Sequence, residues 1–285
     1  GYRMKLGLVP INVGVASIDQ MTELAQHAEA LGFESVWTFE HVITPVDYAS
    51  KYPYDRSGKT GIEPESNFLD PLIALTHIAA VTTTLRLGTG VNILPQVSPL
   101  YLAKQVASLE FASRGRVELG LGIGWLREEY QALGVPFERR GARFDDYVEA
   151  LRKVWSGDEV EHQSEFLSWS GFKSNPAAES LRIVIGGDKG RAFERTARFA
   201  QGWFAPTNSA DSLRKGMRSL TEACDAVGRD PADIEITCMW DARGGVAEVE
   251  AFAAAGANRL LVPLQALGSE PLKAMETLAR DVIAS

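Results

Sequence analysis

The sequence predicts an α/β protein that folds as one (β/α)8 TIM barrel with loop insertions, and three observations support this fold. Short apolar segments alternate with amphipathic helical segments along the whole chain, which is the pattern of a parallel sheet covered by helices. We count eight of each, and eight such units in about 250 residues, plus insertions, make a barrel. No nucleotide-binding fingerprint follows the first strand, so a doubly wound sheet fits less well.

Hydrophobic periodicity, together with residues that begin or end helices, sets the expected boundaries of the strands and helices. Strands are expected at the short apolar runs, which are residues 5–10, 35–39, 85–94, 116–124, 182–187, 202–206, 234–240 and 259–264. Asp19 is the expected N-cap of the first helix, which Gly32 ends, and Asp70 followed by Pro71 begins the second. A helical turn follows Trp125, and the other helices are expected at residues 19–31, 70–82, 99–112, 143–155, 189–200, 210–228, 246–255 and 271–283.

Two segments lie outside this alternation. Residues 42–67 form a long polar stretch with three prolines and several glycines, and a loop of this length inside a compact domain is usually a functional lid or a disordered segment. Residues 156–181 are polar and irregular, with a short hairpin expected at 165–169. We see no domain boundary, so 1–285 is expected to be a single domain. Residues 1–3, which precede the first methionine, are expected to be a remnant of expression.

Composition narrows the class of protein. The formal net charge is -8, which argues against a nucleic-acid or anionic-membrane surface. No apolar run approaches the roughly 18 residues of a membrane span, and no signal peptide is seen. Cys224 and Cys238 are expected to be free buried thiols. Because the four histidines are scattered and no CxxC occurs, we expect no metal site and a cytoplasmic protein.

The segment RVELGLGIGWLREEY, residues 116–130, is the most informative part of the chain. Read at period two, its apolar side chains fall on one strand face and three glycines fall on the other. The preceding strand carries Gly88 and Gly90 in the same alternation. If these faces point inward, one wall of the upper barrel has no side chains, and a flat ring could lie against it. The alternatives are a dinucleotide fingerprint, whose G-x-G-x-x-G spacing does not match, and a glycine face packed by neighbouring side chains.

The same parity places two charged residues on the inner faces, lower in the barrel. These are Arg86 and Glu118. Because an unpaired charge at such a place would be costly, we expect the two side chains to form an ion pair.

In barrels the active site lies at the carboxyl ends of the strands, so the residues at those ends are the candidates. Glu40 and His41 follow the second strand. Histidine is the side chain that most often exchanges protons near neutral pH, although a lone histidine is more often structural. Glu128 and Glu129 follow the fourth strand, where the dipole of the next helix also favours carboxylates.

GGDKGR, residues 186–191, joins the fifth strand to a helix. Backbone N–H groups at a helix N-terminus bind phosphate, and glycine lets the phosphate come close. Lys189 and Arg191 add positive charge. The alternative is an ordinary turn with solvated Lys and Arg side chains.

Several segments together resemble the luciferase-like flavin and deazaflavin oxidoreductases, and are most similar to the branch that uses the deazaflavin coenzyme F420. They occur in the order of the family and span most of the chain. The segments are FEHV at 39–42, LGTGVNILPQ at 87–96, GRVELGLGIGWLREEYQALG at 115–134, ERRGARFDDYVEALRKVW at 138–155 and IGGDKGRAFERTARFAQGWFAP at 185–206.

The resemblance implies a TIM barrel with an insertion after the third or fourth strand, and a homodimer. It also implies a non-proline cis peptide near the end of the third strand, at Gly90–Val91. By the same carry-over, Glu40 and His41 lie near the cofactor ring, and residues 186–187 lie at the cofactor phosphate.

One position departs from the family pattern. In the sugar-phosphate dehydrogenases of this branch, the position of Trp125 holds a glutamate thought to donate a proton. That acid is missing here, so this chain is not expected to be such a dehydrogenase. A proton donor, if one is needed, would be His41, Glu128, Glu129 or solvent.

We therefore predict an oxidoreductase that transfers a hydride between F420 and an organic substrate that the sequence does not identify. His41, Glu40 and Glu129 are the candidate catalytic residues. The loop 42–67, which contains Tyr48, Tyr52 and Tyr54, is the expected substrate lid. The candidate cofactor-binding residues are Gly90, Val91, Asn92, Gly124, Trp125, Gly186, Gly187 and Arg191.

Other functions stay open at this point. The first is an FMN-dependent luciferase-like monooxygenase, and the second is a non-catalytic carrier or sensor of a flavin or deazaflavin. A wholly different barrel enzyme would show all-trans geometry around Gly90 and a filled inner wall. The expected partners are a small-molecule substrate and a second copy of the chain, not a nucleic acid or a membrane.

Overall fold

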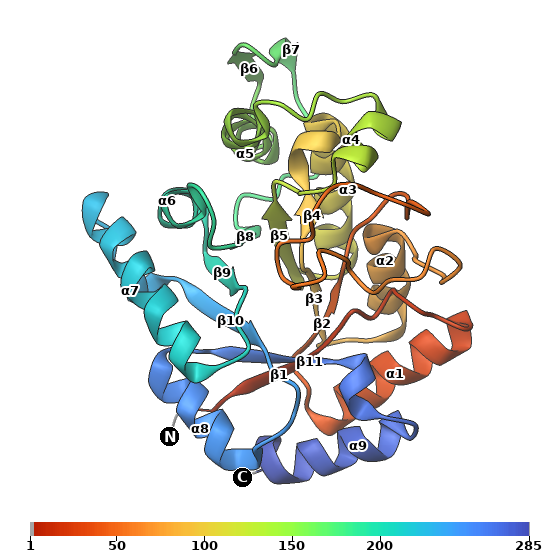
Figure 1. The fold of residues 1–285 in the computed structure, drawn as a ribbon. Coiled ribbons are helices and arrows are strands. Elements are labelled where there is room, and N and C mark those ends of the chain that lie inside the picture. The colour runs from red at the N-terminus through yellow and green to blue at the C-terminus, as the bar shows by residue number, and fades with distance from the viewer. Residues whose placement is uncertain (1–2, 285) are drawn as a thin grey trace.

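Parallel strands form one sheet that closes into a barrel (Figure 1). The computed structural model describes residues 3–284. β1 pairs with β2 and β11, and a pairing of β3 with β5 closes the ring. A doubly wound sheet has two open edges, so this closure excludes it. The strands are β1 (Lys5–Val9), β2 (Ser35–Thr38), β3 (Arg86–Thr89), β4 (Asn92–Ile93), β5 (Val117–Gly122), β8 (Arg182–Gly186), β9 (Gly202–Ala205), β10 (Glu235–Met239) and β11 (Arg259–Pro263).

Helices surround the barrel and alternate with its strands (Figure 1). Asp70 caps α2 as predicted, but Ser17 rather than Asp19 caps α1, since its side chain accepts a hydrogen bond from the N–H of Gln20. None of the helices in residues 3–284 has both the length and the apolar character needed to cross a bilayer. The helices are α1 (Ile18–Leu31), α2 (Pro71–Val81), α3 (Pro99–Ala112), α4 (Arg127–Leu133), α5 (Arg140–Trp155), α6 (Ala192–Phe199), α7 (Ala210–Ala226), α8 (Gly245–Ala255) and α9 (Pro271–Leu278), with short turns η1 (Leu94–Gln96), η2 (Pro231–Asp233), η3 (Leu264–Leu267) and η4 (Ala279–Ile283).

The third predicted strand is interrupted. β3 ends at Thr89, and the Gly90–Val91 peptide bond that follows is cis, as the family resemblance implied. β4 then resumes the pairing with β5. The two short strands therefore occupy one position in the barrel, and η1 leads the chain out to α3.

The insertion between the fourth and fifth barrel strands is a larger hairpin than predicted. β6 (Val160–Gln163) and β7 (Ser168–Phe172) are antiparallel, and they lie beside α5 outside the barrel (Figure 1). The hairpin expected at 165–169 covers only its turn and the start of β7, because residues 165–167 form the turn, where the Ser164 hydroxyl accepts hydrogen bonds from the N–H groups of Phe166 and Leu167. α5 begins at Arg140, three residues before the predicted start at 143.

The lower barrel is closed by a network of buried charges. Glu118 is 1% exposed, and its Oε1 lies 3.0 Å from Nε of Arg86, which confirms the predicted ion pair. Nε of Arg182 is also 3.0 Å from Glu118. Arg259, equally buried, binds Glu34 and Glu235. Burial alone would raise the pKa of Glu235, but Arg259 and the neighbouring cations lower it to about 2.

The remaining expectations about single residues are met in part. Cys224 and Cys238 are free and buried, as predicted. Within the described part of the chain, no three His, Cys, Asp or Glu side chains are grouped as metal ligands. Residues 1 and 2 of the expected expression remnant lie outside the described residues, but the guanidinium of Arg3 donates to the carbonyl of Ile283.

We predict that Glu118→Gln lowers the free energy of unfolding by about 3–5 kcal/mol, because removing one member of a buried ion pair leaves its partners uncompensated. Urea unfolding followed by circular dichroism measures this change. Glu179→Gln is the matched control, since Glu179 is exposed. Equal stability of the two variants would contradict the assigned role of the network.

Candidate active site

Glu129 joins three separate segments at the carboxyl end of the barrel. It lies in the first turn of α4 and is 1% exposed. Its Oε1 is 3.2 Å from Nδ1 of His41, which follows β2. Its Oε2 accepts the N–H of Val42 at 2.7 Å and that of Ile43 at 3.4 Å. Because the carboxylate is an acceptor, this geometry favours the His41 tautomer with the proton on Nδ1, so Nε2 is the atom left to exchange a proton.

Glu40 lies close to this pair. Its Oε1 accepts a hydrogen bond of 2.8 Å from the N–H of Ile93 in β4. Burial raises the pKa of Glu40 to about 8, and the charges of Glu129 and Asp70 act in the same direction, against the effect of the Ile93 hydrogen bond. The carboxyl group therefore carries a proton at neutral pH. The structure thus brings the three candidate catalytic residues together, although 88 positions separate His41 from Glu129.

Glu128 has a different role from the proton donor that we considered for it. Its carboxylate accepts hydrogen bonds from the N–H groups of Ala49 and Ser50, at 2.9 and 3.2 Å, and from the Ser50 hydroxyl at 2.7 Å. Burial opposes these bonds, but they outweigh it and lower the pKa of Glu128. The ionised carboxylate of Glu128 therefore holds the lid in place and does not act as an acid.

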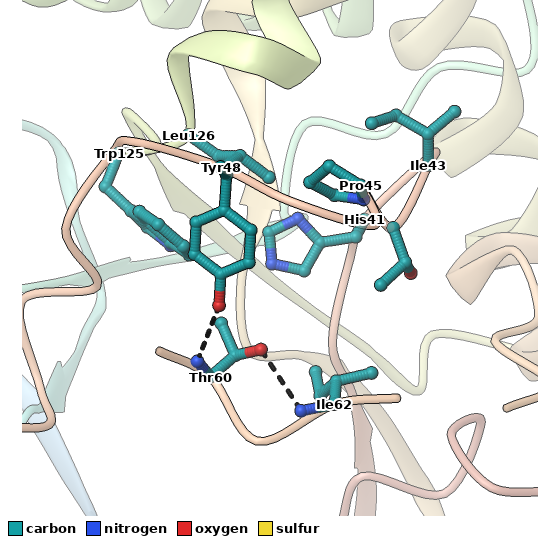
Figure 2. Close-up of a pocket in the computed structure, with 9 residues that line it drawn as sticks. His41, Ile43, Pro45, Tyr48, Thr60, Ile62, Trp125 and Leu126 are labelled. Carbon is teal, nitrogen blue, oxygen red and sulfur yellow. Dashed lines mark hydrogen bonds between the residues drawn. The ribbon is translucent and has the colours of Figure 1, made fainter. Parts of the chain in front are cut away.

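The lid places aromatic rings around Trp125. The ring centroid of Trp125 lies 5.7 Å from that of Tyr48 and 5.2 Å from that of Tyr52, and 6.1 Å from that of His41. Tyr48 is fixed in turn, because its hydroxyl accepts the N–H of Thr60 at 3.0 Å (Figure 2). The segment 42–67 is thus an ordered cover over the candidate catalytic residues.

A small pocket lies between the lid and the barrel (Figure 2). Its volume is about 10 Å³, which is room for one water molecule at most. A substrate can therefore reach His41 only when the lid moves or its rings are displaced. The pocket is lined by His41, Ile43, Thr44, Pro45, Tyr48, Thr60, Ile62, Trp125 and Leu126.

The glycine faces of β3 and β5 point inward as predicted, but they are not bare. A Cβ on Gly88 would meet the Trp37 ring at 2.3 Å, and one on Gly122 would meet Val91 at 2.6 Å. A Cβ on Gly90 would meet the ring of Phe204 at 2.5 Å. The glycines therefore make room for side chains from other parts of the barrel, so the idea of an empty wall was wrong. A flat cofactor ring would have to lie above Val91 and Phe204.

Two buried amides near the end of β4 have acceptor atoms without a partner in the described residues. They are Oδ1 of Asn92 and Oε1 of Gln96. Nε2 of Gln96 donates to Glu129 at 3.4 Å, which places Gln96 in the site. The sequence places Gln96 just beyond the end of the third strand, where site residues are expected, but assigns it no role. The signal for a site role is its position, a glutamine at a strand end and two residues before Ser98, the N-cap of α3.

The segment between β8 and α6 fits an anion only in part. Gly187 has φ +103, a conformation that favours glycine, and α6 has no side-chain cap at its N-terminus, but the N–H of Ala192 already donates to the carbonyl of Lys189 at 3.1 Å. Arg191, however, lies on the surface with 66% of its side chain exposed and is 2.9 Å from Glu194. The structure thus does not place Arg191 in a pocket.

Comparison with known proteins identifies the family. The family model described as luciferase-like monooxygenase matches residues 7–270. The chain belongs to the luciferase-like monooxygenase family. An uncharacterized protein of Mycobacterium tuberculosis (strain ATCC 25618 / H37Rv) is 32% identical over 218 residues, which are 76% of this chain and 75% of that protein. The FMNH(2)-dependent dimethylsulfone monooxygenase of Pseudomonas fluorescens (strain Pf0-1) is 28% identical over 202 residues, which are 69% of this chain and 50% of that enzyme.

Solved structures of luciferase-like proteins share the fold. The coenzyme F420-dependent tetrahydromethanopterin reductase of Methanopyrus kandleri superposes with a TM-score of 0.79 at 15% identity, over 99% of both chains. The monooxygenase RslO1 of Streptomyces bottropensis superposes with a TM-score of 0.75 at 23% identity, also over 99% of both chains. Family membership supports an oxidoreductase with a deazaflavin or flavin cofactor and does not decide between the two.

We predict that Glu40 makes stability depend on pH. Its pKa rises from 4.5 in the unfolded chain to about 8 in the fold, so between these values the folded state keeps a proton that the unfolded state releases. The free energy of unfolding of the wild type should therefore fall by more than about 1 kcal/mol, relative to Glu40→Gln, as pH rises through this window. Urea unfolding at pH values below, within and above the window measures it. Parallel pH profiles would contradict the assignment, and Glu179→Gln is the control.

Proposed function

We propose that this luciferase-like protein is a cytoplasmic F420-dependent oxidoreductase that transfers a hydride between the deazaflavin and an organic substrate. The observation that carries the proposal is the joining of His41, Glu129 and Glu40 at the carboxyl end of the barrel, beneath a lid. Two free buried cysteines agree with a reducing compartment.

The residues around β4 and β8 fit a flat cofactor with an anionic tail. The ring would be held at Gly90, Val91 and Asn92, where the unpartnered Asn92 carbonyl oxygen is a ready acceptor for a donor on the ring. Gly124 and Trp125 would border it, and the tail would lie at Gly186 and Gly187, while Arg191 would have to leave Glu194 to reach it. When bound, the cofactor would supply the hydride chemistry, and the protein supplies orientation and proton handling.

Proton handling is assigned to His41 and Glu40. Nε2 of His41 is free to take or give a proton because Glu129 holds Nδ1 at 3.2 Å. Glu40 carries a proton at neutral pH, since its pKa is raised to about 8, and a carboxyl group kept neutral by its surroundings can serve as an acid. Glu40 is thus a source of the proton that a glutamate at the position of Trp125 would otherwise supply.

Titration of the purified protein with F420 and with FMN tests the proposal. We expect F420 to bind more tightly, and His41→Asn to lower turnover by about 10²–10⁴-fold while cofactor affinity changes little. Binding of FMN that is tighter by orders of magnitude would overturn the cofactor assignment. Cofactor binding without oxidation of reduced F420 by any substrate of a broad panel would favour a carrier or sensor.

The second candidate is an FMN-dependent monooxygenase. Two curated relatives with named activities support it, the dimethylsulfone enzyme and a flavin-dependent trigonelline monooxygenase oxygenase component of Acinetobacter baylyi, which is 30% identical over 166 residues. Oxygen consumption coupled to reduced FMN, absent with F420, would establish this candidate.

We propose that the chain forms a homodimer through α2 and α3. Three large apolar side chains are exposed on these adjacent helices: Ile73 is 72% exposed, and Tyr101 and Phe111 are each 75% exposed. Large exposed apolar side chains on neighbouring helices can form an association site. Light scattering after size exclusion should show a dimer that Tyr101→Lys converts to a monomer. Val227→Lys, on another exposed apolar side chain, should leave the mass unchanged, and a monomeric wild type would contradict the proposal.

A further inference from the structure

The chemistry of the pocket wall restricts what can approach His41. In the described residues, its lining is aromatic and aliphatic apart from His41 and two threonines, and it includes no Lys or Arg. Two of its hydroxyl groups already accept hydrogen bonds within the lid. The Tyr48 hydroxyl accepts the Thr60 N–H, and the Thr60 hydroxyl accepts the N–H of Ile62 at 3.1 Å (Figure 2). Apart from His41 and these hydroxyl groups, the wall therefore offers ring faces and methyl groups, and no charged side chain other than His41.

Three cationic side chains near the pocket are paired with other groups of the protein. Nζ of Lys59 donates to the carbonyl of Tyr48 at 2.9 Å and lies 4.0 Å from the Tyr48 ring centroid. Arg127 binds Glu138 at 2.7 Å, and Arg140 donates to the carbonyl of Gly124 at 3.2 Å. Both guanidinium groups also stack on Phe137. None of these three cations lines the pocket.

The acidic residues around the pocket act against anions and offer little to cations. Glu128 and Glu129 are ringed by N–H and hydroxyl donors from the lid and by His41. Their negative charge would repel an anion, most strongly at the buried Glu129, where charge is screened poorly. The same donors already satisfy these carboxylates, and Glu40 is neutral at pH 7 because its pKa is raised to about 8. A cation would therefore gain no unpaired carboxylate.

The arrangement of the rings suits a planar guest. Trp125 contacts Tyr48 and Tyr52 at tilted angles of 62° and 56°, and the rings fill the space between lid and barrel so that only about 10 Å³ remains. A planar ring that displaces the tyrosines from Trp125 would replace those contacts with stacking of similar strength. The contact energy lost when the lid opens would then be largely offset. An extended polar guest could not replace these ring contacts.

From these contacts we infer that the substrate is an uncharged, planar ring compound that stacks on Trp125, and that phosphorylated or carboxylated substrates are rejected. This inference rests on the proposed function, because it takes the pocket beside His41 as the substrate site. It names the substrate class that the cofactor assignment leaves open.

The test is equilibrium dialysis of the cofactor-loaded protein against three probes of nearly the same ring. They are naphthalen-2-ol, which is neutral, 2-naphthyl phosphate, which is anionic, and N-methylquinolinium, which is cationic. We expect the neutral probe to bind at least about tenfold more tightly than either charged probe, a difference of about 1.4 kcal/mol. Trp125→Ala should weaken the neutral probe by a similar factor.

A charge-gain variant separates electrostatics from shape. Ile62→Lys places an ammonium group in the pocket wall, and it should raise affinity for 2-naphthyl phosphate by at least about tenfold. Ile62→Met is the matched control, with a side chain of similar length and no charge, and it should leave the phosphate probe weakly bound. Unchanged cofactor affinity of the two Ile62 variants verifies that they are folded, and circular dichroism verifies this for Trp125→Ala, since Trp125 would border the cofactor.

The outcomes distinguish this inference from the proposed function. If neither F420 nor FMN binds, the proposed function fails. If a cofactor binds and either charged probe binds as tightly as naphthalen-2-ol, or if naphthalen-2-ol does not bind, the substrate class is wrong while the oxidoreductase assignment stands. A lack of response of the phosphate probe to Ile62→Lys would show that the pocket in Figure 2 is not where the ring binds.

Discussion

The organisation of the candidate active site depends on one buried carboxylate, that of Glu129. It accepts hydrogen bonds from the lid backbone and from Gln96, and it holds the imidazole of His41. A buried carboxylate is stable only when such donors surround it, so the position of the lid, the ring orientation of His41 and the end of β4 are linked. A change at any one of them leaves the Glu129 carboxylate with fewer hydrogen-bond donors. The catalytic candidate and its cover are therefore a single structural unit.

Charged, apolar and titratable groups occupy different levels of the barrel. The lower end is a salt-bridge network of high charge density around Glu118 and Arg259. The middle is apolar, where Trp37, Val91 and Phe204 fill the space that the glycines leave. The upper end has carboxyl groups in a weakly solvated setting, where Glu40 becomes neutral. Because the apolar layer lies between them, the stabilising charges at the floor are insulated from the titrating groups at the site.

Local patterns were enough to predict most of the fold. Eight apolar runs with helical spacing between them gave a barrel, and period-two parity correctly placed Gly88 inward and paired Arg86 with Glu118. The contents of the glycine wall could not be predicted, because the Trp37 and Phe204 rings come from strands distant in sequence. Caps were ambiguous for a similar reason. Ser17 and Asp19 are both good caps in isolation, and only the backbone path selects Ser17.

The sequence brought Glu40, His41 and Glu129 together as candidates, but it could not predict the contact that each one makes. Glu128 and Glu129 are adjacent and chemically identical, yet one fastens the lid at Ala49 and Ser50 while the other holds His41. The helical turn separates them by about 100° around α4, so each meets a different partner. The proton on Glu40 is equally invisible in the sequence, because it arises from burial and from the charge of Glu129, a residue 89 positions away in the chain. With Trp125 in place of an acid at the rim, the protonated carboxyl group lies instead at the end of β2, below the aromatic cover. An acid in that position is shielded from solvent by the rings that we assign to substrate binding, so proton supply and substrate recognition would depend on the same movement of the lid.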